Sequence, residues 1–324
     1  MPDKNIHNSK QIYSTPIDLS IVIPLLNEEK SIEELYRRIE EAVQDYSYEV
    51  IFVDDGSSDA SWDIITSLSD KNFHIKGIRF RRNYGKSDAL QAGFDEAQGR
   101  FVITMDADLQ DDPFEIPAMV EMLENGEELI SGWKRTRHDP ITKTVPSRFF
   151  NTVTRWSTGI KLHDFNCGLK AYQKEVVKSI YLYGELHRYV PLLAKWQGFN
   201  KIAEKEVKHH PRKYGKTKFG ISRFLNGFLD LITLLFVKRY MQRPMHFFGS
   251  LGIIFLILGS GVNVYLVYLK LFLGEAIGNR PLLFLGVLLV VVGVQFFSIG
   301  FLGEMLNRGQ VKKQKPNISD KKGL

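Results

Sequence analysis

Short apolar runs alternate with helix-like segments over the first 110 residues of the chain. Four runs are continuous enough to predict buried strands, at residues 19–25, 50–53, 75–80 and 101–105. Between these runs the apolar residues recur every three or four positions, as in Ile32, Leu35 and Ile39. Helices are therefore expected after Asn27, through residues 62–68 and from about residue 87 to 97. The alternation predicts an α/β fold whose mainly parallel sheet is covered by helices on both faces.

The pattern changes beyond Met245. Residues 247–269 and 282–303 contain no Asp, Glu, Lys or Arg. Each run exceeds the roughly 20 apolar residues that cross a bilayer, and each is apolar on all faces, which favours membrane spans over buried helices of a soluble core. The flanking segments are rich in Lys and Arg, which marks the cytoplasmic side of a membrane. We therefore expect a multi-pass protein of the cell (inner or plasma) membrane, with its large domain and both termini in the cytoplasm.

These patterns divide the chain into five segments. We expect a disordered N-terminal segment (1–18), a cytoplasmic α/β domain (19–218), an amphipathic juxtamembrane helix (219–244), two transmembrane helices (245–305) and a basic cytoplasmic tail (306–324). The juxtamembrane assignment depends on a broad apolar face between Phe219 and Phe236, which is typical of a helix lying on a membrane surface. Residues 144–156 have a similar pattern, which packing into the domain core explains equally well.

Composition and short motifs narrow the class of function. The chain has 324 residues and a formal net charge of +6. Beside two membrane spans, this charge suggests an anionic membrane surface or phosphate ligands as partners, and we find no nucleic-acid-binding module. The first strand is not followed by G-x-G-x-x-G and the chain contains no G-x-x-x-x-G-K-[ST], so a dinucleotide fold and a P-loop NTPase are disfavoured. The single cysteine, Cys167, excludes an intrachain disulfide.

Polar clusters follow three of the predicted strands. These clusters are Asn27-Glu28, Asp54-Asp55 and Asp106-Ala107-Asp108. Because the carboxyl ends of parallel strands meet at one edge of a sheet, the clusters are expected to converge there. Side chains two apart on extended backbone share a face, so Asp106 and Asp108 are expected to point the same way. Such a pair suits a hard divalent cation that also holds a diphosphate, although Asp-x-Asp is also common in solvated turns.

Longer motifs carry a family resemblance over about residues 18–305. The segments SIVIPLLNEE (20–29), VDDGSSD (53–59), RRNYGKSDALQAGF (81–94) and DADLQDDP (106–113) resemble family 2 glycosyltransferases with the GT-A fold. Together with the two apolar runs, five further segments narrow the resemblance to polyprenyl-phosphate glycosyltransferases: GWKRTR (132–137), SRFFN (147–151), DFNCGLKAY (164–172), HRYVP (187–191) and HHPRKYGKTKF (209–219). This group includes dolichyl-phosphate mannose synthases and bacterial undecaprenyl-phosphate glucosyl- and aminoarabinosyltransferases. The domain at 19–218 is then expected to be a GT-A catalytic domain.

The resemblance implies an enzyme that moves a hexose, with inversion, from a nucleotide sugar to the phosphate of a membrane polyprenol. UDP-glucose is the first donor expected and GDP-mannose the second. The resemblance also implies Mg²⁺ or Mn²⁺ as cofactor, membrane lipid beside the site and a homo-oligomer. A processive polysaccharide synthase is an alternative on the same fold, but the chain lacks Gln-x-x-Arg-Trp and two spans are too few for a polymer channel. A catalytically inactive membrane scaffold is the alternative from another class, and the intact acidic and basic motifs oppose it.

The donor side of the site is assigned by the same resemblance. Pro24, Asn27 and Glu28 are expected to line the nucleoside pocket, although a plain helix N-terminus also explains Asn27-Glu28. Asp55 is expected to accept a hydrogen bond from the ring N–H of the base. Lys86 lies on a glycine turn before a helix, which is a suitable place for a phosphate.

The acidic residues are expected to hold the metal and serve the chemistry. Asp106, Asp108 and Gln110 are the expected metal ligands, and Asp106 is also expected to contribute to nucleotide binding. Asp108 and Asp164 are the expected catalytic residues, with Asp164 near the sugar or, alternatively, acting as a structural cap. Asp111-Asp112 is more simply interpreted as the cap of the helix that follows.

Basic residues are assigned to the acceptor and the diphosphate. A phosphate monoester has a second pKa of about 6, so the acceptor needs cations rather than a strong general base. The residues expected to bind these anions are Lys134, Arg135, Arg148, Thr152, Arg212 and Lys218. Many relatives have Arg at the first of these positions, and the Lys134-Arg135 sequence leaves open which residue contacts the acceptor. Arg212 and Lys218 lie on a basic loop that is expected to close over the diphosphate or, alternatively, to bind anionic lipid head groups.

Overall fold

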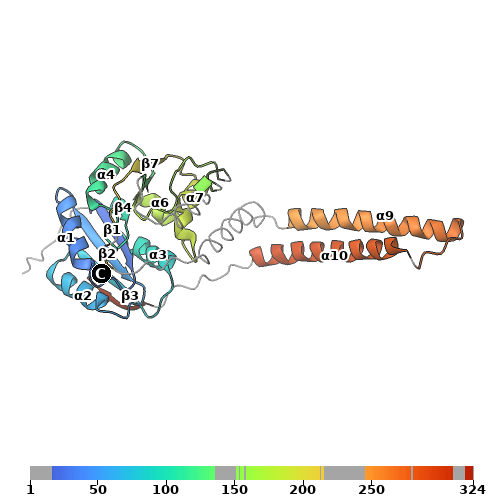
Figure 1. The fold of residues 1–324 in the computed structure, drawn as a ribbon, viewed down its shortest axis with the longest axis horizontal. Coiled ribbons are helices and arrows are strands. Elements are labelled where there is room, and N and C mark those ends of the chain that lie inside the picture. The colour runs from blue at the N-terminus through green and yellow to red at the C-terminus, as the bar shows by residue number, and fades with distance from the viewer. Residues whose placement is uncertain are drawn as a thin grey trace, which may run out of the picture. The chain divides into compact units, whose positions relative to one another are not determined.

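The fold of the chain was analysed in a computed structural model. The structure describes residues 17–135, 151–152, 154–156, 158–211, 213–214, 245–278, 280–308 and 318–323. The chain divides into two compact units, Met1–Gly227 with Lys315–Leu324, and Phe228–Gln314. The first unit holds the α/β domain and the second holds the long apolar helices (Figure 1).

One mixed sheet forms the centre of the first unit. Its strands lie in the order β7-β5-β6-β4-β1-β2-β3-β8. Their bounds are β1 (Leu19–Leu25), β2 (Tyr48–Asp54), β3 (Ile75–Phe80), β4 (Phe101–Thr104), β5 (Leu129–Trp133), β6 (Lys170–Gln173), β7 (Ile202–Glu206) and β8 (Ile318–Lys322). The strands β1 to β4 are parallel to one another, β6 runs antiparallel to both β4 and β5, and β7 is parallel to β5. The predicted mainly parallel sheet is therefore present.

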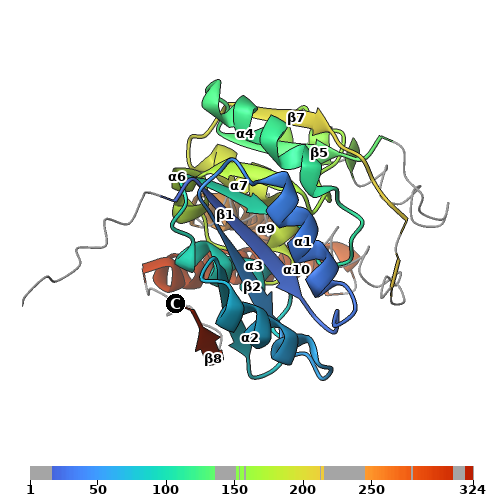
Figure 2. The same cartoon turned by 90° about the vertical axis from the view of Figure 1, so that its left-hand side faces the viewer.

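Helices cover both faces of this sheet (Figure 1, Figure 2). Among the described residues of the first unit, the structure has helices α1 (Ile32–Ala42), α2 (Ser61–Lys71), α3 (Lys86–Glu96), α4 (Ile116–Glu124), α6 (Lys174–Ser179) and α7 (Val190–Trp196), with 3₁₀ turns η1 (Pro113–Glu115) and η2 (Leu186–Tyr189). Successive side chains of β1 point to opposite faces of the sheet, as in any β-strand. Ile21 and Ile23 join the core beneath α1, α2 and α4, whereas Val22 faces Gly93 of α3. The buried strands thus read as continuous apolar runs because both of their faces are covered.

The C-terminal residues depart from the expected tail. Residues 318–322 form β8, which pairs antiparallel with β3 and covers what would otherwise be the edge of the sheet. An unpaired edge strand is a template for aggregation, so this pairing protects the domain. The expected juxtamembrane helix (219–244) lies outside the described residues, as do residues 1–16.

The described part of the second unit contains a pair of long helices. The segment η4 (Met245–Gly249) leads into α9 (Ser250–Phe272), and α10 spans Pro281–Arg308. Small residues allow the two backbones to approach, since a Cβ added to Gly259 would lie 2.9 Å from the carbonyl oxygen of Gly286. Two stretches, Met245–Phe272 and Pro281–Met305, are long and apolar enough to cross a membrane, and most of their residues are not buried inside the protein. They are candidate membrane spans, close to the runs expected from the sequence.

Candidate functional site

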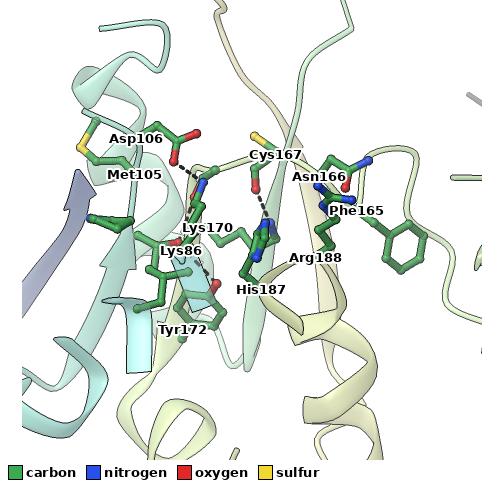
Figure 3. Close-up of a pocket in the computed structure, with 14 residues that line it drawn as sticks. Lys86, Met105, Asp106, Phe165, Asn166, Cys167, Lys170, Tyr172, His187 and Arg188 are labelled. Carbon is green, nitrogen blue, oxygen red and sulfur yellow. Dashed lines mark hydrogen bonds and ion pairs between the residues drawn. The ribbon is translucent and has the colours of Figure 1, made fainter. Parts of the chain in front are cut away.

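A small pocket lies at the carboxyl ends of β1 and β4 (Figure 3). We call it the rim pocket. Its walls come from β1, the segment after β4, the first turns of α3, residues 165–168, β6 and η2, and include Pro24, Lys86, Asp106, Lys170 and His187. Its volume is about 20 Å³, which is room for about one water-sized group. The rim pocket is therefore too small to hold a sugar nucleotide by itself.

The acidic segment after β4 alternates between buried and accessible residues. Ala107 and Leu109 are buried, whereas Asp106, Asp108 and Gln110 are partly exposed. Leu109 has a positive φ of 62°, and the backbone N–H of Gln110 donates to Asp108 Oδ1 at 3.2 Å. Burial of the alternate apolar residues thus leaves three oxygen-bearing side chains partly exposed, and of these Asp106 lines the rim pocket. Carboxylate and amide oxygens of this kind fit a hard divalent cation.

The protein itself supplies few ligands for such a cation. Among the residues that the structure describes, no three His, Cys, Asp or Glu side chains gather closely enough to form a metal site on their own. This fits Mg²⁺ and related ions that are held by one or two carboxylates together with substrate phosphates. It argues against a closed structural metal site in the described part of the chain.

Lys86 lies directly against Asp106. The two side chains form an ion pair, and each is about one-third exposed, 33% and 35%. Burial raises the pKa of the Asp106 carboxyl, but the charge of Lys86 and its hydrogen bond outweigh that effect and lower the pKa to about 2. Lys86 is the first residue of α3, and Gly85 before it has a φ of 101°, which favours glycine. A charged lysine at this helix start can meet a phosphate.

Asp55 fixes the turn that carries Lys86. Its two carboxylate oxygens accept from the backbone N–H groups of Tyr84 at 2.7 Å and Gly85 at 2.9 Å. Burial raises the pKa of Asp55, and these two hydrogen bonds oppose the rise. The observed contacts of Asp55 are thus structural, and its assignment to the nucleotide base stays a prediction. Asp54, also structural, accepts from Ser57 N and lies 3.5 Å from Arg79 Nε.

The loop after β1 is locked to the loop after β2. Asn27 has a φ of 57°, its backbone N–H donates to Ser57 Oγ at 2.8 Å, and its Oδ1 accepts from Ser58 N at 2.8 Å. The backbone N–H of Glu28 donates to Ser61 Oγ at 3.0 Å. Pro24 lines the rim pocket. The predicted nucleoside-binding residues therefore belong to one rigid edge of the sheet.

The segment 164–168 closes the pocket against Asp106. A Cβ added to Gly168 would lie 2.7 Å from the Asp106 carboxyl carbon, so this position brings backbone directly against the acidic residue. Asp164 is 1% exposed, and its Oδ1 accepts from Asn166 N at 3.0 Å. Asp164 does not line the rim pocket, whereas residues 165–168 do. In this arrangement Asp164 shapes the turn, and its predicted role near the sugar is untested.

Two adjacent basic residues have opposite surroundings. Lys134 is largely buried, and its Nζ lies 2.7 Å from Oδ1 of Asp111, whose side chain is fully buried. Arg135 is 67% exposed and faces Glu206 at 3.4 Å. The expected helix cap is made by Asp112, which accepts from Phe114 N, whereas Asp111 is occupied by Lys134. Of the other predicted anion-binding residues, Thr152 is exposed, and Arg148, Arg212 and Lys218 lie outside the described residues.

Three pocket residues received no role in the sequence argument. Lys170 and Tyr172 are alternate residues of β6 that point the same way, and His187 follows on η2 (Figure 3). Burial lowers the pKa of Lys170, and burial together with the charges of Lys86 and Arg188 holds the pKa of His187 well below its usual range. The period-two spacing in DFNCGLKAY was an available signal for Lys170 and Tyr172, once that segment is read as a strand.

The sequence of this chain is similar to the sequences of known proteins over most of its length. The model of the family "Glycosyl transferase family 2" matches residues 20–181. Dodecaprenyl-phosphate galacturonate synthase from Rhizobium johnstonii is 41% identical over 300 residues, covering 90% of this chain and 88% of that protein. Undecaprenyl-phosphate 4-deoxy-4-formamido-L-arabinose transferase from Pseudomonas aeruginosa is 35% identical over 299 residues, covering 90% and 86%.

Solved structures share the fold of the first unit. Glucosyl-3-phosphoglycerate synthase from Mycobacterium tuberculosis, in complex with phosphoglyceric acid, matches with a TM-score of 0.53 and 22% identity over 68% of this chain and 79% of that chain. The same enzyme in complex with Mn²⁺ and uridine-diphosphate-glucose matches with a TM-score of 0.52 and 23% identity, over 68% and 78%. At these identities the likeness establishes the fold alone.

Proposed function

Because the chain belongs to glycosyl transferase family 2, we propose that it transfers a sugar from a nucleotide donor to the phosphate of a membrane polyprenol. The observation that carries the proposal is the accessible acidic segment, with Asp106 paired to Lys86, at the carboxyl edge of the sheet. The same chain contains two candidate membrane spans. A soluble donor and a membrane-bound acceptor require both features. The two relatives named above, which the chain matches over nearly its whole length, act on polyprenyl phosphates by name.

We infer that the donor carries an acidic or modified sugar. The relatives are named for galacturonate and for a formamido-arabinose. Nucleotide donors of these sugars should therefore be tested before those of glucose and mannose. The walls of the rim pocket also contain Lys86, Lys170 and Arg188 beside one acid, Asp106, and this excess of basic residues favours an anionic sugar. UDP-glucose and GDP-mannose then serve as the neutral-sugar comparisons.

A divalent cation, Mg²⁺ or Mn²⁺, is part of the proposal. Asp106, Asp108 and Gln110 would hold it, since they are the oxygen donors on the accessible side of the acidic segment. When bound, the cation neutralises charge on the departing diphosphate. Lys86 supplies a second positive charge from the start of α3, where backbone N–H groups also favour an anion.

The acceptor phosphate supplies the nucleophile. One of its oxygens attacks the anomeric carbon of the sugar while the bond from that carbon to the diphosphate oxygen breaks, and the electron pair leaves with the diphosphate. Because the phosphate is already anionic near neutral pH, the site needs cations that bring two anions together rather than a base. We assign this task to Lys86 and Arg135, with Arg148, Arg212 and Lys218 as further proposed contacts.

We further infer that the α/β domain and both termini lie in the cytoplasm. If α9 and α10 each cross the membrane once, the chain returns to the side that it left. Pairing of β8 with β3 supports this arrangement, because the residues after α10 belong to the same sheet as the residues before α9. The basic flanks of the spans agree with a cytoplasmic placement.

The proposal is tested with the full-length protein in detergent. The protein is incubated with undecaprenyl phosphate, Mg²⁺ or Mn²⁺ and a panel of radiolabelled nucleotide sugars, and the label entering the organic phase is counted. We expect one donor to label a lipid product only when the metal is present, with no product from undecaprenol. No lipid label from any donor, or label in a long water-soluble polymer, would overturn the proposal, the latter in favour of a processive synthase.

A further inference from the structure

The pair formed by Lys134 and Asp111 is unusual for a site that binds exchangeable anions. Lys134 Nζ lies 2.7 Å from Asp111 Oδ1, and the exposed fractions of the two side chains are 13% and 0%. Within the described ranges, no donor other than Lys134 reaches the Asp111 carboxylate. The charge of Lys134 is thus the charge that neutralises a fully buried acid. Moving this lysine toward a substrate would leave that acid unpaired inside the protein, which is strongly unfavourable.

The pair also connects three segments of the site. Lys134 directly follows β5, and Asp111 lies in the acidic segment, next to Gln110. The backbone of Asp111 bridges to His209, just beyond β7, and His210 N donates to Gln110 O at 2.9 Å. The side-chain pair therefore ties the acidic segment to the end of β5, whereas backbone contacts tie it to the residues after β7. Burial raises the pKa of Asp106 at the other end of the segment, and the charge of Lys86, followed by the charge of Lys134, lowers it.

The neighbouring residue, Arg135, is exposed to water, whereas Lys134 is largely buried. Arg135 is 67% exposed, and its partner Glu206 is 53% exposed at a distance of 3.4 Å. A pair this exposed stabilises the fold little and exchanges its partner easily. The guanidinium can also grip a phosphate with two parallel hydrogen bonds, which a lysine cannot do.

From this contrast we propose that Lys134 is a positioning residue, the permanent internal counter-ion of Asp111, and that Arg135 is the residue of this segment that meets the acceptor phosphate. Lys134 holds the acidic segment, in which Asp106 lines the rim pocket and Asp108 and Gln110 are partly exposed. The statement about Arg135 rests on the proposed function, whereas the statement about the buried pair does not.

A double-mutant cycle on the intact protein tests the buried pair. The variants are Lys134→Met, Asp111→Asn and the double variant, followed by thermal unfolding in detergent. Each single change leaves an unpaired buried charge, so each should lower the melting temperature by several degrees, and the double variant, which leaves only an unmatched neutral amide, should recover part of the loss. Additive losses would overturn the pairing. If Lys134→Met does not fold, Lys134→Arg should fold with a smaller loss because it keeps the charge.

The exposed neighbours give a matched control. Arg135→Gln, Glu206→Gln and their double variant should all melt within error of the wild-type protein, because their pair is open to water. A coupling as large as that of the buried pair would contradict the distinction between the two basic residues.

Acceptor binding separates the two roles. Binding of undecaprenyl phosphate, with undecaprenol as the control lipid, is measured directly and therefore does not depend on the sugar donor. We expect Arg135→Gln to weaken binding by about tenfold, a loss of one charge-assisted contact, and the Lys134→Met/Asp111→Asn double variant to bind within about twofold of the wild-type protein, since it keeps every acceptor contact that we propose. A tenfold loss in the folded double variant would overturn the proposal. Failure of the wild-type protein to bind would refute the proposed function and leave the melting result standing.

A positioning role also predicts a pattern in the metal requirement. Where transfer is observed, Lys134→Met and the Lys134→Met/Asp111→Asn double variant should both raise the Mn²⁺ concentration needed for half-maximal rate, because neither retains the pair that holds the acidic segment. A change in maximal rate alone, with no shift in the Mn²⁺ requirement, would indicate general destabilisation instead.

Discussion

Two lysine–aspartate pairs flank the same acidic segment and differ in their access to water. The pair Lys86–Asp106 lies at the rim pocket, with exposed fractions of 33% and 35%. The pair Lys134–Asp111 lies beneath the segment, with exposed fractions of 13% and 0%. Both pairs join a lysine that follows a strand or turn to an acid of DADLQDD, so their chemistry is the same and only their burial differs.

The difference in burial assigns different tasks to the two pairs. A water-accessible ion pair contributes little to stability, so its members can separate and bind substrate or metal at small cost. Breaking a buried pair leaves a charge without solvent or partner, which costs about 3–5 kcal/mol. The exposed pair is therefore suited to chemistry and the buried pair to holding the segment in place. The predictions below probe this division.

The largest effect on activity is expected from the exposed pair. Asp106→Asn replaces a proposed, negatively charged metal ligand by a neutral amide, and transfer should fall by about 10²-fold or more. The free energy of unfolding should change by less than about 1 kcal/mol, because Lys86 keeps its access to water. Radiolabel transfer and chemical unfolding measure the two quantities. Asp108→Asn should show the same loss of transfer. Asp45→Asn is the control, because Asp45 is an exposed residue outside the acidic segment. Near-normal, metal-independent transfer by either site variant would refute the metal assignment.

A smaller loss is expected when Asp106 is displaced rather than removed. In Gly168→Ala the new Cβ would lie 2.7 Å from the Asp106 carboxyl carbon, so the carboxylate must shift. A displacement of this size lowers catalysis by roughly tenfold to 10²-fold, while the buried pair is untouched. The control is Gly261→Ala, since nothing lies within 4 Å of that added Cβ. Unchanged kinetics in Gly168→Ala would show that the close contact does not position Asp106.

The burial of Cys167, the one cysteine of the chain, should be visible in how the unfolding free energy depends on pH. Burial raises the pKa of Cys167 to about 12, although the charge of Lys134 lowers it, against an ordinary value of 9.0. Between these two pH values an unfolded chain loses the thiol proton while the folded chain keeps it, so this group lowers stability as pH rises through the window. The unfolding free energy of the wild-type protein should therefore decline more steeply from pH 9 to 10.5 than that of Cys167→Ala. Parallel pH profiles, or rapid alkylation of the folded protein at neutral pH, would contradict the burial of the thiol.

The sequence predicted the layout of the fold well, for identifiable reasons. Continuous apolar runs and helix-spaced residues predicted β1 to β4 and the intervening helices, because both faces of a parallel sheet exclude water. The resemblance to family 2 glycosyltransferases with two C-terminal apolar helices is confirmed by the family match, the relatives and the shared fold. The donor, the site roles and the membrane topology stay predictions.

The direction of individual side chains was the part that sequence could not predict. Lys134 and Arg135 are adjacent cations just past the end of β5, where no periodic pattern continues. Asp111 looked like a helix cap, but Asp112 takes that position and leaves Asp111 for Lys134. Only the packing of β5 and β6 beside the acidic segment decides which cation turns inward. The eighth strand was missed for a similar reason, since its pairing partner β3 lies more than 200 residues away in the chain.

A third lysine–aspartate pair extends the comparison to the surface and should give the smallest effect. Lys322 Nζ lies 2.7 Å from Asp70 Oδ1, at the same distance as the buried pair, but the exposed fractions are 41% and 57%. If burial rather than distance sets the value of a pair, Lys322→Met should change the unfolding free energy by no more than about 0.5 kcal/mol and leave transfer unaltered. Chemical unfolding of Lys322→Met beside Lys134→Met measures the contrast directly. Equal losses in the two variants would mean that β8 depends on this ion pair and that exposure does not rank the three pairs.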